Sequence, residues 1–329
     1  MRIRSVHPVT FIMLLACCLI GCDSAVFDNL SDCPQGVNFH FYSQTPCEQF
    51  PNYPSDIRQV RVFAFDEKDV LVSEFSDKKA VLSADYSLPV TLRHTGKLTF
   101  VAWGGRDLEA YDFSGFKEGV TTKQEMWVAL RLKDRRVSSA SGPLYVGLVS
   151  ISLENRENLG SVYERVSFNM RELTYRVHFT IKSIPDPFPM DEKFVIRIED
   201  DNGVYDFNGQ IALCERFEYV AEATRDTEGV LKADFTLMKL EEGRNTLVSL
   251  VNKTTGEILY TANLVDDIIM FRGDSGEPPY SLVCDHDFPI TLKLKYEKET
   301  WTLVQATVLD WNVVSRPVEL GADIISGQI

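Results

Sequence analysis

The sequence predicts an all-β protein in which two antiparallel β-sandwich domains follow one another in tandem. Apolar and polar residues alternate over many short segments, which is the period of a half-buried strand. Turn-forming residues separate these segments at short, regular intervals, as in antiparallel sandwiches. Long helical patterns are scarce, and residues 22–329 are enough for two domains of ordinary size.

The first half contains five segments with the composition of strands. In 37–41 (VNFHF) alternate residues are apolar, and 60–65 (VRVFAF) leads into a turn of charged residues at 66–69. The other three expected strands are 97–103, 144–151 and 161–169. A helix of one or two turns is expected over 124–132.

The second half begins with another alternating segment, 173–181 (LTYRVHFTI). The strand expected at 194–199 runs into Asn202-Gly203, a pair that favours a two-residue hairpin turn, so 204–207 is expected to return beside it. Thr255-Gly256 predicts a second hairpin tip. Further strands are expected at 234–240, 246–251, 258–262, 290–296 and 303–308.

These patterns divide the chain into five parts. The predicted domain boundary lies near Asn169–Arg171. Residues 1–21 are the expected signal peptide, and residues 22–36 are polar and predict a tether. The N-terminal sandwich is expected at 37–170, the C-terminal sandwich at 171–315, and a tail at 316–329.

The N-terminus has the three parts of an export signal. Arg2 and Arg4 precede an apolar run at 9–20, which is too short to span a bilayer. The run ends in Leu19-Ile20-Gly21-Cys22, the pattern at which bacterial lipoproteins are cut and lipidated. Ordinary secretory cleavage fits less well, because it favours a small residue where Leu19 stands. The sequence therefore predicts a lipid on Cys22 and stable attachment to a membrane, since two or three acyl chains suffice for it.

The mature chain is strongly acidic. Removal of the signal takes away two of the 34 Lys and Arg residues and none of the 48 Asp and Glu residues, leaving a formal charge of 32 − 48 = −16. Nucleic-acid binding requires a basic surface, so this class of partner is excluded. Broad electrostatic adhesion to anionic lipid is disfavoured for the same reason.

Four cysteines remain after processing and lipidation: Cys33, Cys47, Cys214 and Cys284. An exported chain meets an oxidising compartment, so disulfides are expected, and four cysteines allow three connectivities. The pair Cys33–Cys47 is the preferred prediction, because these residues are close in sequence and flank one short strand. Buried free thiols are the alternative.

Two short motifs share one loop. Gly273-Asp274-Ser275-Gly276-Glu277-Pro278 resembles a serine-protease segment, but Glu277 replaces a glycine and no histidine has the sequence context of that family. Arg272-Gly273-Asp274 is the tripeptide that integrins bind, a match that arises often by chance. A polar loop between strands is the preferred interpretation of both.

Two acidic segments are weak candidates for metal binding. In Asp285-His286-Asp287 only the two aspartates would share a face of a strand. The segment Glu199-Asp200-Asp201-Asn202 lacks the ligand spacing of a calcium loop. No segment has the pattern of a known catalytic motif, and Trp103, Trp301 and Trp311 are expected in the core. The sequence therefore predicts neither an enzyme nor a bound metal or cofactor.

Several segments, in this order, resemble the FimB-type fimbrial anchor family, the fimbrillin-associated anchor lipoproteins of Bacteroides-like bacteria. They begin with the lipidation motif and continue along almost the whole mature chain. The segments are 30–37 (LSDCPQGV), Cys47, 60–66 (VRVFAFD), 98–105 (LTFVAWGG), 196–206 (IRIEDDNGVYD), Trp301 and 308–314 (VLDWNVV).

This resemblance implies a fold and a role. Both sandwiches are expected to be transthyretin-like, and the protein is expected in the outer membrane at the base of a fimbrium. Its expected partners are fimbrial subunit proteins, joined by strand donation, and the membrane itself through the Cys22 lipid. An exposed sheet edge suits strand donation because its N–H and C=O groups lack partners. The resemblance carries over no catalytic residue.

A surface lipoprotein that binds a glycan or a host protein is the alternative function. The tail from Asn312 to Ile329 is one candidate for a donated strand. Pro317 removes a ladder donor and Gly321 weakens a strand, so the tail suits a subunit that ends a polymer. A frayed terminus is the other interpretation of this segment.

Overall fold

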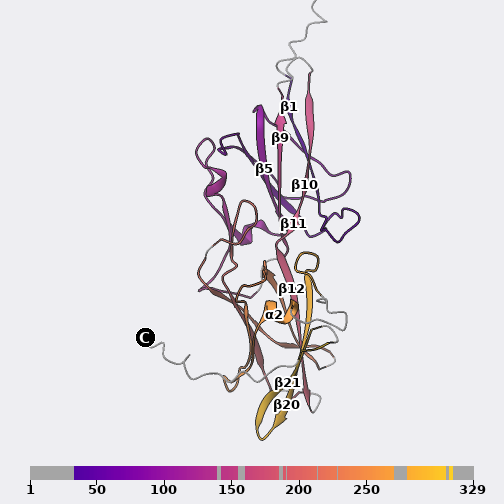
Figure 1. Cartoon of the computed structure of the whole chain (residues 1–329), viewed down its shortest axis with the longest axis vertical. Coiled ribbons are helices and arrows are strands. Elements are labelled where there is room, and N and C mark those ends of the chain that lie inside the picture. The colour runs from indigo at the N-terminus through magenta and orange to yellow at the C-terminus, as the bar shows by residue number, and fades with distance from the viewer. Residues whose placement is uncertain are drawn as a thin grey trace, which may run out of the picture.

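Two β-sandwiches lie end to end along the long axis of the molecule (Figure 1). The computed structural model describes residues 33–138, 142–154, 160–184, 188–189, 191–212, 214–227, 229–269, 280–308 and 311–313. Nearly all regular structure in these residues is strand, apart from two 3₁₀ turns and the short helix α2 (Leu264–Ile269). The predicted all-β fold with tandem sandwiches is confirmed.

The first sandwich packs a narrow sheet against a wide one. The narrow sheet joins, in spatial order, β10 (Val162–Asn169), β1 (Gln35–Tyr42) and β4 (Leu88–Thr91). The wide sheet joins β11 (Arg171–Glu172), β9 (Leu144–Leu153), β5 (Gly96–Gly105), β2 (Gln59–Phe65) and β3 (Leu71–Asp77).

The second sandwich has sheets of six and five strands. The larger joins β16 (Thr224–Arg225), β17 (Leu231–Met238), β12 (Thr174–Ile184), β20 (Asp287–Glu297), β21 (Thr300–Val308) and β22 (Trp311–Val313). The smaller joins β19 (Ile258–Asn263), β18 (Leu247–Asn252), β13 (Phe194–Asp200), β15 (Phe217–Glu222) and β8 (Arg136–Val137).

One arrangement of strands occurs in both sandwiches. In the first, β1 pairs in parallel with β10 and antiparallel with β4. In the second, β12 pairs in parallel with β20 and antiparallel with β17. These two sheets are thus mixed, although most pairs of the described strands are antiparallel as predicted. The alternation of apolar residues reports which face is buried and carries no information on strand direction.

The wide sheet of the first sandwich is buried on both faces. Residues Leu98, Phe100 and Ala102 of β5 face the narrow sheet, in a cluster drawn from residues 37–170 that we call the inner core. Val101 and Trp103 face the other way, into a larger cluster with residues of both sandwiches that we call the shared core. Burial of both faces explains why this strand is apolar along most of its length.

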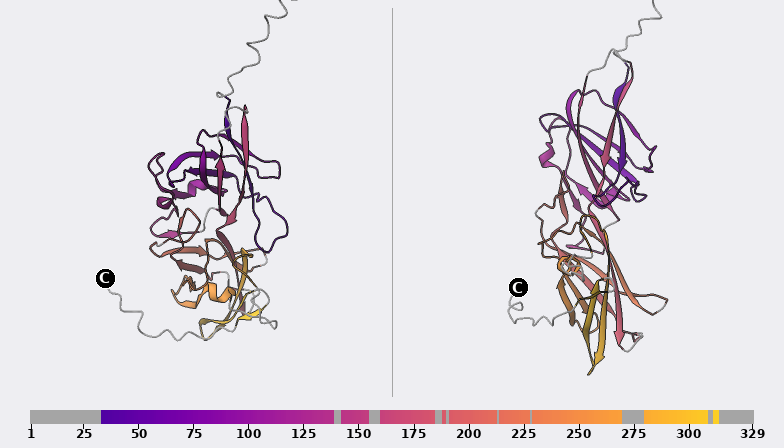
Figure 2. Two further views of the ribbon diagram at one scale, coloured as in Figure 1. Left: turned by 45° about the horizontal axis from the view of Figure 1, so that its top comes forward. Right: turned by 45° about the vertical axis from the view of Figure 1, so that its right-hand side comes forward.

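Residues 106–137 connect the sandwiches by main-chain pairing. Strand β7 (Trp127–Leu130) lies between β6 (Tyr111–Phe113) of its own half and β14 (Val204–Asp206) of the other. A few residues later, β8 pairs in parallel with β15. Figure 2 shows from two sides that this purple and pink chain lies between the indigo and orange parts of the molecule.

The structure corrects two local predictions. Asn202-Gly203 is no hairpin tip, because β13 pairs with β15 and β18 while β14 pairs with β7. Residues 124–132 form a 3₁₀ turn (Lys123–Glu125) followed by β7, since pairing with both neighbours decides the conformation there. The tip predicted at Thr255-Gly256 is confirmed: Gly256 has a φ of 76° between the antiparallel β18 and β19.

Candidate functional site

A disulfide joins the two sandwiches where they meet, a region that we call the waist (residues 43–58, 169–175 and 280–287). It links Cys47 to Cys284, with 5.9 Å between their Cα atoms and 237 residues between them in sequence. The prediction of Cys33–Cys47 was wrong, and Cys33 and Cys214 are free thiols. Proximity in sequence misled because β1 carries the chain from Cys33 to the waist, and Cys284 lies there, three residues before the start of β20.

Hydrogen bonds surround the disulfide on both sides. The Asn169 side chain accepts from the Gln44 N–H at 2.9 Å and donates to the Gln44 carbonyl at 3.0 Å. His286 Nδ1 lies 2.9 Å from the Thr174 carbonyl, and because a carbonyl only accepts, Nδ1 carries the proton. The His286 ring also stacks on Tyr175 with 4.7 Å between centroids. These contacts hold the loops of both sandwiches against residues 169–175.

A cavity of ≈ 1120 Å³ opens at the waist beside the disulfide. Charged groups of both signs line it, among them Glu48, Arg171 and Lys239. The Tyr145 hydroxyl, also in its wall, donates to Glu172 at 3.4 Å, and burial together with that carboxylate raises the pKa of Tyr145. The cavity therefore combines charged groups with apolar surface, and its volume is slightly above the usual range of small-ligand sites.

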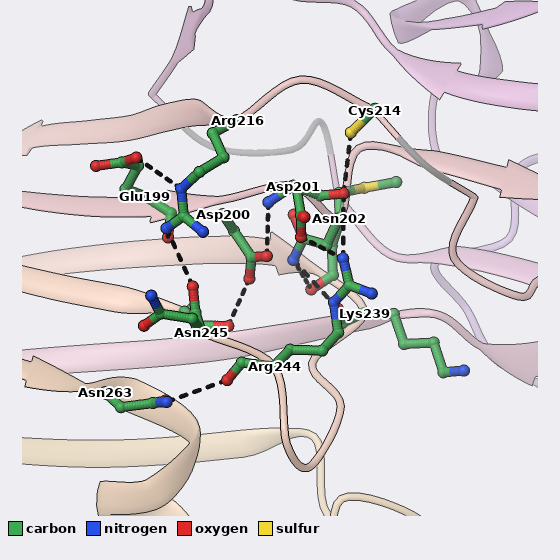
Figure 3. Close-up of polar contacts among 12 residues, drawn as sticks. Glu199, Asp200, Asp201, Asn202, Cys214, Arg216, Lys239, Arg244, Asn245 and Asn263 are labelled. Carbon is green, nitrogen blue, oxygen red and sulfur yellow. Dashed lines mark hydrogen bonds and ion pairs between the residues drawn. The ribbon is translucent and has the colours of Figure 1, made fainter.

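A second group of polar residues lies where β13 ends (Figure 3). We call it the β13 polar cluster, and it consists of Glu199, Asp200, Asp201, Arg216, Arg244 and Thr246. The Arg216 Nε donates to Glu199 at 2.7 Å, and the Arg244 guanidinium pairs with Asp201. Between them, Asp200 accepts from the Thr246 hydroxyl at 2.6 Å and from the Asp201 N–H at 2.7 Å. Burial raises the pKa of Asp200 to about 6, against the opposing effect of these donors.

Next to the β13 polar cluster, the buried side chains of Asn202, Tyr219 and Tyr205 form hydrogen bonds with the backbone where β17 ends. The Asn202 amide donates to the carbonyls of Met238 and Lys239 at 3.2 and 3.1 Å. The Tyr219 hydroxyl donates to the Asn202 carbonyl oxygen and accepts from the Met238 N–H, both at 3.1 Å. Tyr205 accepts from the Lys239 N–H. The polar atoms of these three side chains form hydrogen bonds inside the protein, so their role is structural.

The remaining candidate motifs fall into two groups. The loop with Ser275 and the Arg272-Gly273-Asp274 tripeptide lies outside the described residues. In the segment Asp285-His286-Asp287, the Asp287 carboxylate accepts a hydrogen bond from Arg176 at 2.9 Å, and the His286 ring donates one to the Thr174 carbonyl. These side chains therefore bond to the protein itself. Across the residues with described positions, no group of three or more His, Cys, Asp or Glu side chains could hold a metal ion. Trp103 and Trp301 are buried as predicted, and the side chain of Trp311 lies outside the described part of the structure.

Several strands lie at the edges of the four large sheets. In the first sandwich these are β4, β10, β3 and β11, and in the second β16, β22, β19 and β8. An edge strand presents N–H and C=O groups on one side that a further strand can bind. The longest is β10, with eight residues, and its other side pairs with β1.

The membrane attachment predicted at Cys22 lies outside the described residues. Within the part of the chain that the structure describes, no helix is long and apolar enough to cross a membrane.

Comparison with known proteins identifies the family. The sequence model for fimbrillin-A associated anchor proteins Mfa1 and Mfa2 matches residues 30–317. The chain belongs to this family. A curated relative, the minor fimbrium anchoring subunit Mfa2 of Porphyromonas gingivalis, is 31% identical over 322 residues, which cover 96% of this chain and 97% of the relative. The predicted membership of a fimbrial anchor family is thereby confirmed.

Solved structures of the same architecture support the fold. The fimbrial anchor protein Mfa2 from Porphyromonas gingivalis matches with a TM-score of 0.71 and 29% identity, over 86% of this chain and 100% of that one. A candidate polysaccharide-binding protein from Bacteroides thetaiotaomicron has a TM-score of 0.70 at 18% identity, covering 87% and 99%. The second likeness extends to the fold alone.

Proposed function

We propose that this chain is an outer-membrane lipoprotein that anchors a fimbrium, held by a lipid on Cys22 and joined to fimbrial subunits through a β-strand. The observation that carries the proposal is membership of a family of fimbrial anchor proteins over residues 30–317. A fimbrial anchor has a structural task, which fits a molecule in which buried polar side chains at the end of β17 bond to its own backbone. Residues 22–36 serve as the tether in this proposal.

The sheet edges support the proposed mode of binding. Strand addition gains main-chain hydrogen bonds along an edge and side-chain contacts on alternate residues. The edge strands β3, β4 and β10 of the first sandwich and β19 and β22 of the second are available for it. The tail at 316–329 follows β22 and is the proposed donated or accepted segment of this chain.

The lipid is tested by two cysteine substitutions near the N-terminus. Cys22→Ala should move the protein from the membrane fraction to the soluble fraction, because it removes the acyl chains. Cys33→Ala is the matched control and should leave the protein in the membrane. Mass spectrometry of the wild-type N-terminus should find an acylated Cys22, and an unmodified N-terminus at another residue would contradict the lipid anchor.

Strand addition is tested by amide hydrogen exchange with and without the fimbrial subunits made by the same cells. Bound subunits should slow exchange along one edge strand and leave β5 unchanged, because β5 pairs on both sides. Deletion of 316–329 should weaken subunit binding if the tail takes part. Binding with no edge strand protected would contradict strand addition, and fimbriae equally attached without the gene would contradict the anchor role.

The waist cavity favours a second candidate function, binding of a glycan. Charged side chains beside apolar surface, in a cavity of ≈ 1120 Å³, suit a small saccharide. Titration calorimetry with oligosaccharides should then give a saturable signal that Arg171→Ala and Lys239→Ala weaken. Heats equal to those of dilution would remove this candidate.

A further inference from the structure

Two connections cross the waist side by side. The backbone makes the first, since β10 ends at Asn169 and continues through β11 into β12. The disulfide makes the second. Cys47 follows the end of β1 at Tyr42 by five residues, and Cys284 precedes the start of β20 at Asp287 by three. The disulfide thus joins β1 to β20 much as the backbone joins β10 to β12.

The strands on either side of the waist are already paired in the same way. Strand β1 pairs in parallel with β10 at eight positions, and β20 pairs in parallel with β12 at nine. Each sandwich therefore contributes one parallel pair, and the two pairs follow one another along the long axis (Figure 1). The result is a two-stranded ribbon through the whole molecule, with a backbone connection in one strand and a disulfide in the other.

Hydrogen bonds extend this ribbon into the waist from both ends. On the first sandwich, the Met170 N–H donates to the Tyr42 carbonyl at 2.6 Å, and Gln44 exchanges two bonds with Asn169. On the second, the Arg176 N–H donates to the His286 carbonyl at 2.7 Å. The stretch between Gln44 and His286 contains the disulfide, so the covalent bond lies where the hydrogen-bonded pairing is interrupted.

We propose that the Cys47–Cys284 disulfide transmits tension from the lipidated N-terminus directly into β20 of the second sandwich. This inference rests on the proposed anchor function. The chain enters the molecule at Gln35, at the end of the long axis away from the second sandwich (Figure 1). A fimbrium joined at β22 or at the tail, two of the proposed attachment segments, pulls on the second sandwich while the lipid holds β1.

The route of the force decides what can unfold. Without the disulfide, a pull on β1 is resisted only by its hydrogen bonds to β10 and β4 and by the inner core. Once these give way, the whole first sandwich can be drawn out. With the disulfide, residues 48–283 lie inside a closed covalent loop and carry no tension when the pull acts on the chain after Cys284. The extension is then limited to the segments outside the loop.

Single-molecule pulling on residues 23–329, with a handle at each end, tests the connection. The Cys47→Ser/Cys284→Ser variant should extend farther than the oxidised wild type by roughly 800 Å, the length of the 237 residues spanned by the bond. Cys214→Ser is the matched control and should extend like the wild type, since Cys214 is a free thiol. Reduction of the folded wild type should reproduce the double variant. Equal extension of the oxidised wild type and the double variant would overturn the proposal.

Cells that carry the fimbriae test the role of the bond. At rest, the double variant should remain in the membrane fraction and hold as many fimbriae as the wild type. Under calibrated flow it should lose several-fold more fimbriae than the wild type or Cys214→Ser. Equal loss under flow would overturn the force path and leave the anchor intact, whereas absence of the wild type from the membrane at rest would contradict the proposed function.

Discussion

At the scale of single residues, Asn202 bonds the backbone where β17 ends. Its side chain is fully buried, and it satisfies two carbonyls and the Tyr219 hydroxyl at once. A buried polar group without a partner costs about 1–3 kcal/mol, so the three groups together depend on this one amide.

Asn202→Ala should therefore lower the free energy of unfolding by about 2–4 kcal/mol, because it leaves buried carbonyls without a donor. Urea denaturation followed by circular dichroism measures the change. Asn245→Ala is the matched control, since Asn245 is exposed and contributes its backbone carbonyl to Arg216. A loss no larger than that of the control would show that water satisfies the freed groups.

Asp200 should make stability depend on pH. Burial raises its pKa to about 6 in the folded protein, above the value near 4 of an unfolded chain. Between these values the folded state holds a proton that the unfolded state lacks, so this group favours folding as the pH falls from about 7 to about 4 and disfavours it as the pH rises. Asp201 and Arg244 are the charged groups beside it.

We compare the unfolding free energy of the wild type with that of Asp200→Asn. As the pH falls from 7 to 4, the wild-type value minus the variant value should increase by up to roughly 3 kcal/mol. Urea denaturation at several pH values gives this difference. Asp85→Asn removes an exposed carboxylate and should leave the slope unchanged. A flat difference for Asp200→Asn would mean that its carboxyl titrates as in the unfolded chain.

At the scale of elements, β7 connects the two sandwiches because it pairs with one strand from each half of the sequence. Val128 lies at its centre, opposite Phe113 of β6 and Tyr205 of β14, and is fully buried. Its loss should therefore loosen strands that belong to different halves of the sequence.

Val128→Ala should destabilise the protein by about 2 kcal/mol. It should also speed amide hydrogen exchange in both β6 and β14. Val120→Ala is the matched control, because Val120 is 60% exposed and should affect neither strand. Faster exchange in β6 alone would indicate that β14 is held by its own sandwich.

The sequence predicted elements well where burial on one or both faces produced a clear pattern. The strands β1, β2, β5, β9 and β12 follow from alternation or from continuous apolar runs. Strand β7 was predicted as helix, because its four residues are too few to show a period and its conformation comes from pairing with β6 and β14. Partners are a property of the folded chain, so neither the disulfide nor the course of β14 could be inferred from local sequence.

At the scale of the whole molecule, the shared core crosses the predicted boundary near residue 170. Phe63 and Trp103 from the first half belong to the same buried cluster as Phe179 and Leu292 from the second. The inner core, in contrast, uses residues 37–170 alone. We therefore expect the two sandwiches to depend on each other for stability.

Residues 35–172 produced alone should melt at a lower temperature than the full chain and bind a hydrophobic dye, because one face of the wide sheet loses part of its cover. Scanning calorimetry and dye fluorescence measure this. The full-length Cys47→Ser/Cys284→Ser variant controls for the lost disulfide. A fragment as stable as this variant would show that the first sandwich is an independent unit.

The parallel pairs also fix an order of events during biosynthesis. Strand β1 is made first, yet its partner β10 follows about 120 residues later, and Cys47 precedes Cys284 by 237 residues. Cys33 and Cys214 also precede Cys284, so both can meet Cys47 first as the chain enters the oxidising compartment. A bond formed with either of them has to be exchanged before Cys47 can join Cys284. Correct maturation of this protein should therefore depend on the cell's disulfide isomerase.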